Sequence, residues 1–129
     1  MPGEWYEGLA KPTWTPPSWL FAPVWTALYG MMAVAAWLVW RRHGAAGARW
    51  PLLLFAVQLS LNSMWSWLFF GLESPGAAMV DIAALWIAIL VTILVFWTLS
   101  RLAATLLVPY LVWVSFAAAL NVAIWRLNA

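Results

Sequence analysis

Residues 77–99 read AAMVDIAALWIAILVTILVFWTL, and Asp81 is the only charged residue among them. A helix needs roughly 20 mostly apolar residues to cross a bilayer, so this run is long enough for one span. Apolar and polar residues do not alternate along it, which excludes the pattern of a membrane β-strand. Residues 77–99 therefore predict a transmembrane helix.

Three further apolar runs have similar lengths. They cover residues 19–40, 51–70 and 102–125. Only Ser100 and Arg101 separate the run 77–99 from the run 102–125, so we expect these two helices to form an antiparallel pair. The predicted fold class is an all-α integral membrane protein with an antiparallel transmembrane helix bundle. Residues 19–129 form that helical domain, and residues 1–18 precede it as an extramembrane segment.

The composition of the whole chain agrees with a membrane domain. Of the 129 residues, 67% are apolar and 8% are charged, and the mean hydropathy is +0.90. A soluble domain carries about 25% charged residues, so a soluble monomer and a disordered chain are both excluded. Six basic residues are too few for a nucleic-acid footprint. One histidine and no cysteine indicate no metal site, and no catalytic constellation is visible.

The charges predict an orientation in the membrane. The loop Arg41–Arg49 holds three arginines, and Arg101 falls on the same side of the bundle. The other side holds Lys11 and Arg126 together with three glutamates. The positive-inside rule therefore places the Arg41–Arg49 loop and Arg101 in the cytoplasm and both termini outside. About half of the 13 tryptophans fall near the two interfaces, as an aromatic belt does.

The N-terminal segment, residues 1–18, is not a span. Three prolines prevent a continuous helix, yet Trp5, Tyr6 and Trp14 make the segment too aromatic to remain free in water. Two interpretations stay open. The segment is either a loop lying on the lipid headgroups or a lid over a cavity between the helix ends.

The second span carries amides on one face. This face holds Gln58, Asn62, Trp65 and Phe69 on a helical wheel. Amide side chains need partners in hydrocarbon, so they are expected to face protein or a cavity. The alternative is that they only join helices, a contribution of about 1 kcal/mol each.

The opposite face of the second span consists of small side chains. Ala56, Ser60 and Ser63 lie on it, with small residues spaced four apart. Such a face lets another helix approach closely, so we interpret it as the seam of a homodimer.

Two other spans carry comparable faces in the same half of the bilayer. The residues are Trp25 and Tyr29 in the first span, and Tyr110, Ala117, Asn121 and Trp125 in the last. These faces and the amide face are expected to converge on one cavity below the N-terminal segment, with Trp14 above it. An aromatic cavity with a few hydrogen-bonding groups suits a large, flat, mostly apolar ligand.

Two residues interrupt the apolar pattern of the last two spans. Pro109 is expected to kink its helix. Asp81 has two interpretations: an acidic residue at the start of its helix near the interface, or a buried site residue.

These residues also carry a family resemblance. The motifs are Trp5-Tyr6, residues 9–17 (LAKPTWTPP), residues 21–29 (FAPVWTALY), Gln58 with Asn62 and Trp65, Pro109-Tyr110, and residues 120–128 (LNVAIWRLN). In this order they resemble the translocator protein family, also called tryptophan-rich sensory proteins, TspO/MBR or peripheral-type benzodiazepine receptors. The resemblance covers essentially the whole chain.

The resemblance implies a fold and a ligand class. Family members are five-helix membrane bundles, commonly homodimers, that bind tetrapyrroles such as protoporphyrin and haem, sterols, and benzodiazepine-type ligands. Trp25, Asn62 and the outer part of the last helix match pocket positions of the family. The implied ligand is a tetrapyrrole, with no obligatory cofactor.

The sequence departs from the family pattern at three places. The family carries one more helix before the Trp5-Tyr6 loop, so four of its five spans are expected in this chain. Val122 and Ala123 stand where animal members have a tyrosine, which does not favour sterol recognition. Val122 also replaces a second pocket tryptophan, which does not favour porphyrin breakdown.

The expected function is that of a membrane receptor or sensor that binds tetrapyrroles and transports or scavenges them. A photo-oxidative, tryptophan-assisted enzyme that degrades porphyrin is one alternative, and a purely structural membrane subunit is another. The expected location is a bacterial cell envelope, with membrane lipid as a further partner.

Overall fold

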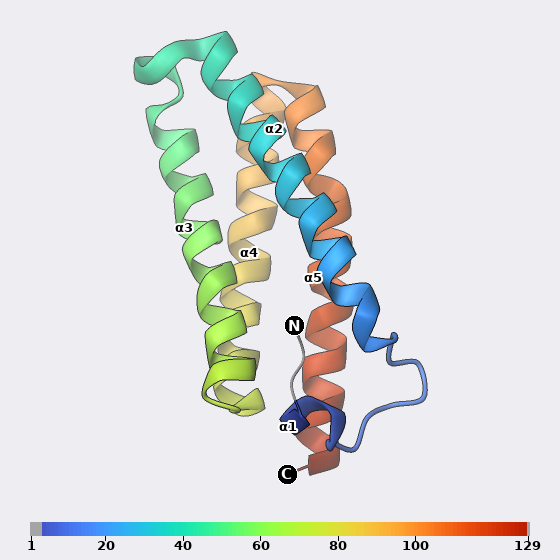
Figure 1. Ribbon diagram of the computed structural model, residues 1–129. Helices are drawn as coiled ribbons and strands as arrows, with labels where there is room; N and C mark the ends of the chain where they lie inside the picture. The colour runs from blue at the N-terminus through green and yellow to red at the C-terminus, as the bar shows by residue number, and fades with distance from the viewer. Residues whose placement is uncertain (1–3, 129) are drawn as a thin grey trace.

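The computed structural model describes residues 4–128 as a bundle of helices (Figure 1). In chain order the elements are α1 (Glu4–Glu7), the 3₁₀ turn η1 (Ser18–Leu20), α2 (Phe21–Gly47), α3 (Arg49–Ser66), the π-helical turn η2 (Trp67–Gly71), α4 (Pro75–Leu99) and α5 (Arg101–Asn128). No strand occurs among the described residues. The predicted all-α bundle with four long helices is confirmed.

Each of the four long helices is long and apolar enough to cross a membrane. The spanning segments are Phe21–Gly44, Arg49–Gly71, Pro75–Leu99 and Arg101–Asn128. The antiparallel α4 and α5 share the most extensive contact, α3 packs against α4, and α2 packs against α5. Although α2 and α3 are consecutive, they touch less and diverge along the bundle (Figure 1).

The connection between the first two spans differs from the expected loop over residues 41–49. Helix continues to Gly47, and α3 begins at Arg49. The chain turns within this helix at Gly44, where φ is 70° and ψ is 178°. Glycine adopts a positive φ without steric cost, so the helix changes direction at Gly44 while the flanking residues stay helical. The chain turns again at Ala48 before α3 begins. The prediction of a loop at Arg41–Arg49 is therefore corrected to a kinked helical connection.

The end of the second span widens into a π-helical turn. The amide of Leu72 donates to the carbonyl of Trp67 at 2.8 Å, which is a bond between residues five apart. Glu73 follows with a φ of 55°, and α4 then starts at Pro75, a favourable residue for a first helical turn. Single π turns occur frequently at functional sites, and this one holds the phenylalanines described below.

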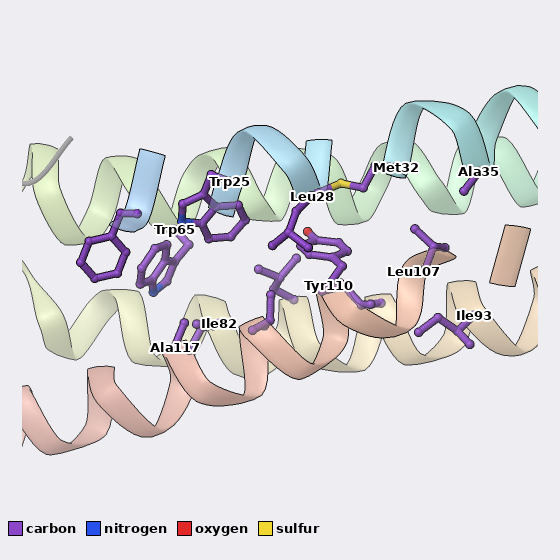
Figure 2. Close-up of a cluster of buried hydrophobic side chains, with 14 of the residues drawn as sticks. Trp25, Leu28, Met32, Ala35, Trp65, Ile82, Ile93, Leu107, Tyr110 and Ala117 are labelled. Atoms are coloured by element: carbon purple, nitrogen blue, oxygen red, sulfur yellow. The ribbon is translucent and has the colours of Figure 1, made fainter. Parts of the chain in front are cut away.

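The core consists of one apolar face from each helix. In α4, for example, Ala78, Ile82, Leu85 and Ile89 recur every three or four residues and are buried. Figure 2 shows side chains of α2 projecting toward Tyr110 and Leu107 of α5. Pro109 lies inside α5, which runs unbroken from Arg101 to Asn128.

Candidate functional site

A chain of hydrogen bonds joins three helices inside the bundle. The Tyr29 hydroxyl of α2 donates to Asn62 Oδ1 of α3 at 2.7 Å. Asn62 Nδ2 donates to the Tyr110 hydroxyl of α5 at 2.7 Å, and this hydroxyl donates to Gln58 Oε1 at 2.7 Å. Gln58, Asn62 and Tyr110 are buried, whereas Tyr29 is 42% exposed. The chain therefore leads from the bundle surface to its centre and holds α2 and α5 against α3.

The inner end of this series of hydrogen bonds is the side-chain amide of Gln58. Gln58 Nε2 is buried and has no hydrogen-bond partner among residues 4–128. An unpaired buried donor costs about 1–3 kcal/mol, so an acceptor that reached it would gain a full hydrogen bond.

A second amide joins α3, α4 and α5. The Trp65 indole nitrogen donates to Asn121 Oδ1 at 2.9 Å, and Asn121 Nδ2 donates to the carbonyl of Pro75 at 2.8 Å. The bond to Pro75 connects α5 to the first turn of α4. Asn121 thus fixes the indole of Trp65 and the start of α4 at the same time.

Trp65 and Asn121 of the second amide system line an aromatic cavity near the end of the bundle where η2 leads into α4. The lining residues are Tyr6, Phe21, Trp25, Trp65, Phe69, Phe70, Trp113, Phe116, Ala117, Leu120 and Asn121. Most of them are aromatic, and their rings pack on one another. Phe69 and Phe70 lie edge to face with centroids 4.8 Å apart, and Trp65 stacks on Phe69 at 5.4 Å. The remaining volume is only about 10 Å³, close to the space of one water molecule.

Two further donors in the cavity lining lack partners. The Tyr6 hydroxyl and the Trp113 indole nitrogen are buried and unbonded within the described part of the chain. The cavity thus combines apolar ring faces with unsatisfied hydrogen-bond donors, which is the composition of a site for a flat ligand with polar edges.

The N-terminal segment closes this cavity through Tyr6. Its ring is 1% exposed and packs edge to face on Phe21, with centroids 5.8 Å apart. Burial, together with the nearby Glu7 carboxylate, raises the pKa of the Tyr6 phenol to about 12. The ammonium of Lys11 lies 4.8 Å from the Tyr6 ring centroid and donates to the Tyr6 carbonyl at 2.8 Å. This local turn presents Tyr6 to the bundle.

Polar bonds to α5 hold the same segment. The amide of Ala10 donates to Asn128 Oδ1 at 3.1 Å, and Asn128 Nδ2 donates to the Ala10 carbonyl at 2.8 Å. Figure 1 shows α1 beside the C-terminal end of α5. Tyr6 of this segment therefore lines the cavity, and both interpretations of residues 1–18 stay predictions.

A wider apolar groove lies outside the cavity, between α2 and α5. Its volume is about 650 Å³. Trp113 and Phe116 line both the groove and the cavity, so these two side chains form a wall between them. Pro16 and Leu20 of the N-terminal region also line the groove.

The structure places the predicted site residues in two groups. Trp25, Trp65, Ala117 and Asn121 line the aromatic cavity. Tyr29, Gln58, Asn62 and Tyr110 form the neighbouring hydrogen-bonded chain instead of lining the cavity. The two groups meet where the Trp25 ring packs on the Tyr29 and Tyr110 rings, with centroids 5.8 and 6.3 Å apart. Figure 2 shows Trp25 and Trp65 close together within the core.

Two predicted residues do not reach the cavity. Trp14 is 46% exposed and packs edge to face on Phe116 from outside, with centroids 5.5 Å apart. Trp125 is 42% exposed and lies against the first turn of α4, where a Cβ at Gly76 would come within 3.1 Å of its indole nitrogen. The helical face drifts by about 60° over the 15 residues from Tyr110 to Trp125, which turns that indole away from the bundle axis.

Several lining residues lay outside the sequence prediction. They are Tyr6, Phe21, Phe70, Trp113, Phe116 and Leu120. The Trp5-Tyr6 motif was visible, but its spacing does not indicate which ring enters the bundle. Phe69 lies on the inward face that the wheel predicts, and Phe70 joins it at the cavity within the π-helical η2, which a wheel with 100° per residue does not anticipate.

Asp81 is buried within α4, with 7% of its surface exposed. Its Oδ2 atom has no hydrogen-bond partner in residues 4–128. Asp81 does not line the aromatic cavity, so its role as a site residue stays a prediction.

The small face of α3 points away from the rest of the chain. Ala56, Ser60 and Ser63 are exposed, and the Ser60 hydroxyl donates to the Ala56 carbonyl at 2.9 Å. That internal bond satisfies the hydroxyl and leaves a flat surface.

Comparisons with known proteins match this architecture. The TspO/MBR family model matches residues 1–126. The chain is 49% identical over 132 residues to the tryptophan-rich protein TspO of Chlorobaculum tepidum, covering 98% of this chain and 82% of that protein. It is 44% identical over 127 residues to the translocator protein of Sus scrofa, covering 97% and 75% of the two chains.

A third relative carries a functional name. The tryptophan-rich sensory protein of Cereibacter sphaeroides is 39% identical over 127 residues, covering 98% of this chain and 78% of the relative. The family model and these relatives cover nearly the whole chain, including all four spans. The chain therefore belongs to the TspO/MBR family, and it is a multi-pass integral membrane protein.

Proposed function

We propose that this chain is a receptor-type membrane protein that binds a tetrapyrrole, such as protoporphyrin or haem, in the aromatic cavity. One observation carries the proposal: a cavity lined mainly by aromatic rings also holds two buried donors, on Tyr6 and Trp113, that have no partner within residues 4–128. Ring faces suit the plane of a tetrapyrrole, and free donors suit the carboxylates at its edge.

The cavity must open before such a ligand enters. Ligand pockets for molecules of this kind measure about 300–1,000 Å³, whereas the closed cavity measures about 10 Å³. Tyr6 is the lining residue that comes from the N-terminal segment, and few polar bonds hold that segment to α5. We infer that movement of this lid displaces the Tyr6 ring and lets the ligand take its place.

Different side chains have different roles in the proposed binding of the tetrapyrrole. Trp25 stacks on the ring or contacts its edge, together with Tyr29. The amides of Asn62 and Asn121 sit beside the site and bond to polar substituents once their present partners shift. Gln58 Nε2 offers a further unused donor.

A fluorescence titration tests this proposal. Protoporphyrin added to the full chain in detergent is expected to quench tryptophan emission saturably. Trp25→Ala is expected to weaken binding at least several-fold, because it removes a buried ring from the cavity lining.

Trp97→Ala is the matched control, since Trp97 is a half-exposed indole at the opposite end of α4. Equal affinity of Trp25→Ala and the unchanged chain would remove Trp25 from the site. Absence of saturable binding in the unchanged chain would favour a purely structural subunit.

A second candidate is light-driven oxidation of the bound porphyrin by dioxygen, with tryptophan as the redox side chain. The observation in its favour is the presence of three indoles in the cavity lining, Trp25, Trp65 and Trp113. Loss of the porphyrin absorbance under light and air, dependent on Trp25, would identify this activity. An unchanged porphyrin spectrum would support binding without degradation.

The biological use of binding is proposed from the relatives. One relative is named a sensory protein and another a translocator protein, so sensing, scavenging or transport of the ligand would follow. Sterol is not proposed as the ligand, because Val122 and Ala123 stand where the family resemblance implies a tyrosine for sterol recognition. We also propose a homodimer through the exposed Ala56, Ser60 and Ser63 face of α3.

A further inference from the structure

The end of the bundle opposite the lid carries four arginines. Three of them lie over tryptophan rings. The pairs are Arg41 with Trp37 at 5.1 Å, Arg49 with Trp50 at 5.5 Å, and Arg101 with Trp97 at 5.3 Å. These indoles are exposed on the outer surface of the spanning helices. Cation and ring together mark the level of the lipid headgroups.

The fourth arginine, Arg42, borders two adjacent hollows between α2 and the turn from α4 to α5. One hollow of about 330 Å³ also contacts Arg101, and the other, of about 350 Å³, also contacts Arg41. Ser100 and Leu102 line both hollows together with Arg42. The two hollows therefore share walls, with three guanidinium groups around them.

A hydrogen bond between helices holds the walls in place. His43 Nε2 lies 3.0 Å from the carbonyl oxygen of Leu99, which ties the end of α2 to the end of α4. The Ser100 hydroxyl accepts from the amide of Ala103 at 3.3 Å and so caps α5. The hollows thus lie between fixed elements of the fold.

Charged and apolar side chains occupy different levels of the hollows. Leu38 stands one helical turn before Arg42 and lines the same hollow, and Leu102 is exposed beside Ser100. The arginines thus adjoin apolar side chains that face the hydrocarbon. A free phosphate would use only the charged layer, whereas a phospholipid would use both.

No carboxylate competes for these arginines. The four acidic residues of the chain are Glu4, Glu7, Glu73 and Asp81, which belong to α1, to the turn before α4 and to the first turns of α4. Among residues 4–128 none of the four guanidinium groups is paired with a carboxylate. A basic hollow between spanning helices at headgroup level is the setting in which membrane proteins hold anionic lipids.

We propose that this arginine hollow binds one anionic phospholipid. Arg42 and Arg101 hold the phosphate, Arg41 adds charge, and the acyl chains run along Leu38 and Leu102. The site is separate from the aromatic cavity, which lies at the other end of the bundle.

Native mass spectrometry of the full chain from dodecyl maltoside micelles tests the proposal. Phosphatidylglycerol is expected to bind with one preferred copy per chain, more tightly than phosphatidylcholine with the same acyl chains. Arg42→Gln and Arg101→Gln are each expected to weaken phosphatidylglycerol binding about fivefold.

Arg49→Gln is the matched control, because Arg49 lies at the same end and on a tryptophan ring but does not line either hollow. It is expected to change the affinity less than twofold. Equal losses of affinity in Arg49→Gln and Arg42→Gln would show that diffuse surface charge attracts the lipid instead of a specific site, and would overturn the proposal. Displacement of the lipid by millimolar inorganic phosphate, or equal binding of phosphatidylcholine, would overturn it as well. Circular dichroism of each variant establishes that the helices are intact.

Discussion

The inward ring cluster at the lid end and the outward tryptophans at the arginine end use aromatic side chains in opposite ways. At the lid end, rings such as Trp65 and Phe69 face inward, pack on one another and leave almost no free volume. At the arginine end, Trp37, Trp50 and Trp97 face outward and lie under guanidinium groups. Exposed indoles occur at the lid end as well, for example Trp19 and Trp67, so the lid end differs by the closed ring cluster that it adds. The difference depends on the helix face, because only the inward face meets other helices.

The largest effect is expected from breaking the inward cluster. Phe69 is buried and contacts the rings of Tyr6, Trp65 and Phe70. Phe69→Ala is expected to lower the free energy of unfolding by about 3–5 kcal/mol, because it leaves a cavity among rings that cannot all collapse into it. Trp97→Ala at the other end is expected to stay within about 0.5 kcal/mol. Unfolding by sodium dodecyl sulfate, followed by circular dichroism, measures both, and equal losses would contradict the comparison.

A smaller loss is expected from the buried hydrogen bonds beside that cluster. Asn62→Leu removes the acceptor of Tyr29 and a donor to Tyr110. We expect a loss of about 1–2 kcal/mol in the free energy of unfolding. Ser115→Ala breaks the bond from the Trp86 indole near the bundle surface, and it is expected to lose about 0.6 kcal/mol. If Asn62→Leu were as stable as the unchanged chain in the same unfolding assay, the hydrogen-bonded chain would not hold α2 in place.

Outward faces are expected to affect association more than stability. Ser60→Leu enlarges the small face of α3 without touching the core, since Ser60 is exposed. The dimer fraction in detergent, measured by cross-linking, is expected to fall, while the free energy of unfolding changes by less than about 0.5 kcal/mol. An unchanged cross-linking pattern would place the dimer contact elsewhere.

No loss of stability at neutral pH is expected for Tyr6→Phe, since the buried phenol has no hydrogen-bond partner within residues 4–128 that the change could break. Folding raises the pKa of this phenol from 10.0 to about 12. The folded state therefore holds the proton more tightly, and this contribution to stability is present below pH 10 and lost as the pH rises toward 12. Tyr6→Phe is expected to remove that part of the alkaline decline. Identical alkaline unfolding curves of the two proteins would show that the phenol remains accessible to water.

The arrangement of spans followed from hydropathy, but the ends of the spans did not. Arg41 and Arg42 suggested the end of the first helix, whereas the helix continues to Gly47 and turns at Gly44. Charged residues signal the edge of the bilayer, not the end of a helix, because water satisfies their side chains while the backbone stays helical. Similarly, Gly71 suggested the end of the second span without revealing the π-helical turn before it.

The candidate site was likewise predicted only in part from the sequence. The helical wheel grouped Gln58 with Asn62, and the structure links both to Tyr110 across the interface with α5. The wheel also placed Trp125 on the face of Tyr110, yet Trp125 is 42% exposed, because that face drifts by about 60° over the 15 residues between them. Tyr6 closes the cavity from a segment without regular periodicity, so no wheel applied to it.

Local composition was enough to establish an all-helical membrane chain with four spans and one arginine-rich end. Hydropathy and charge are properties of each segment, and the bilayer acts on each segment separately. Only the tertiary structure decided that Trp65 bonds to Asn121, that Tyr6 enters the bundle, and that Arg42 borders the turn from α4 to α5. Such pairings depend on the rotation and register of whole helices, which contacts between distant segments set.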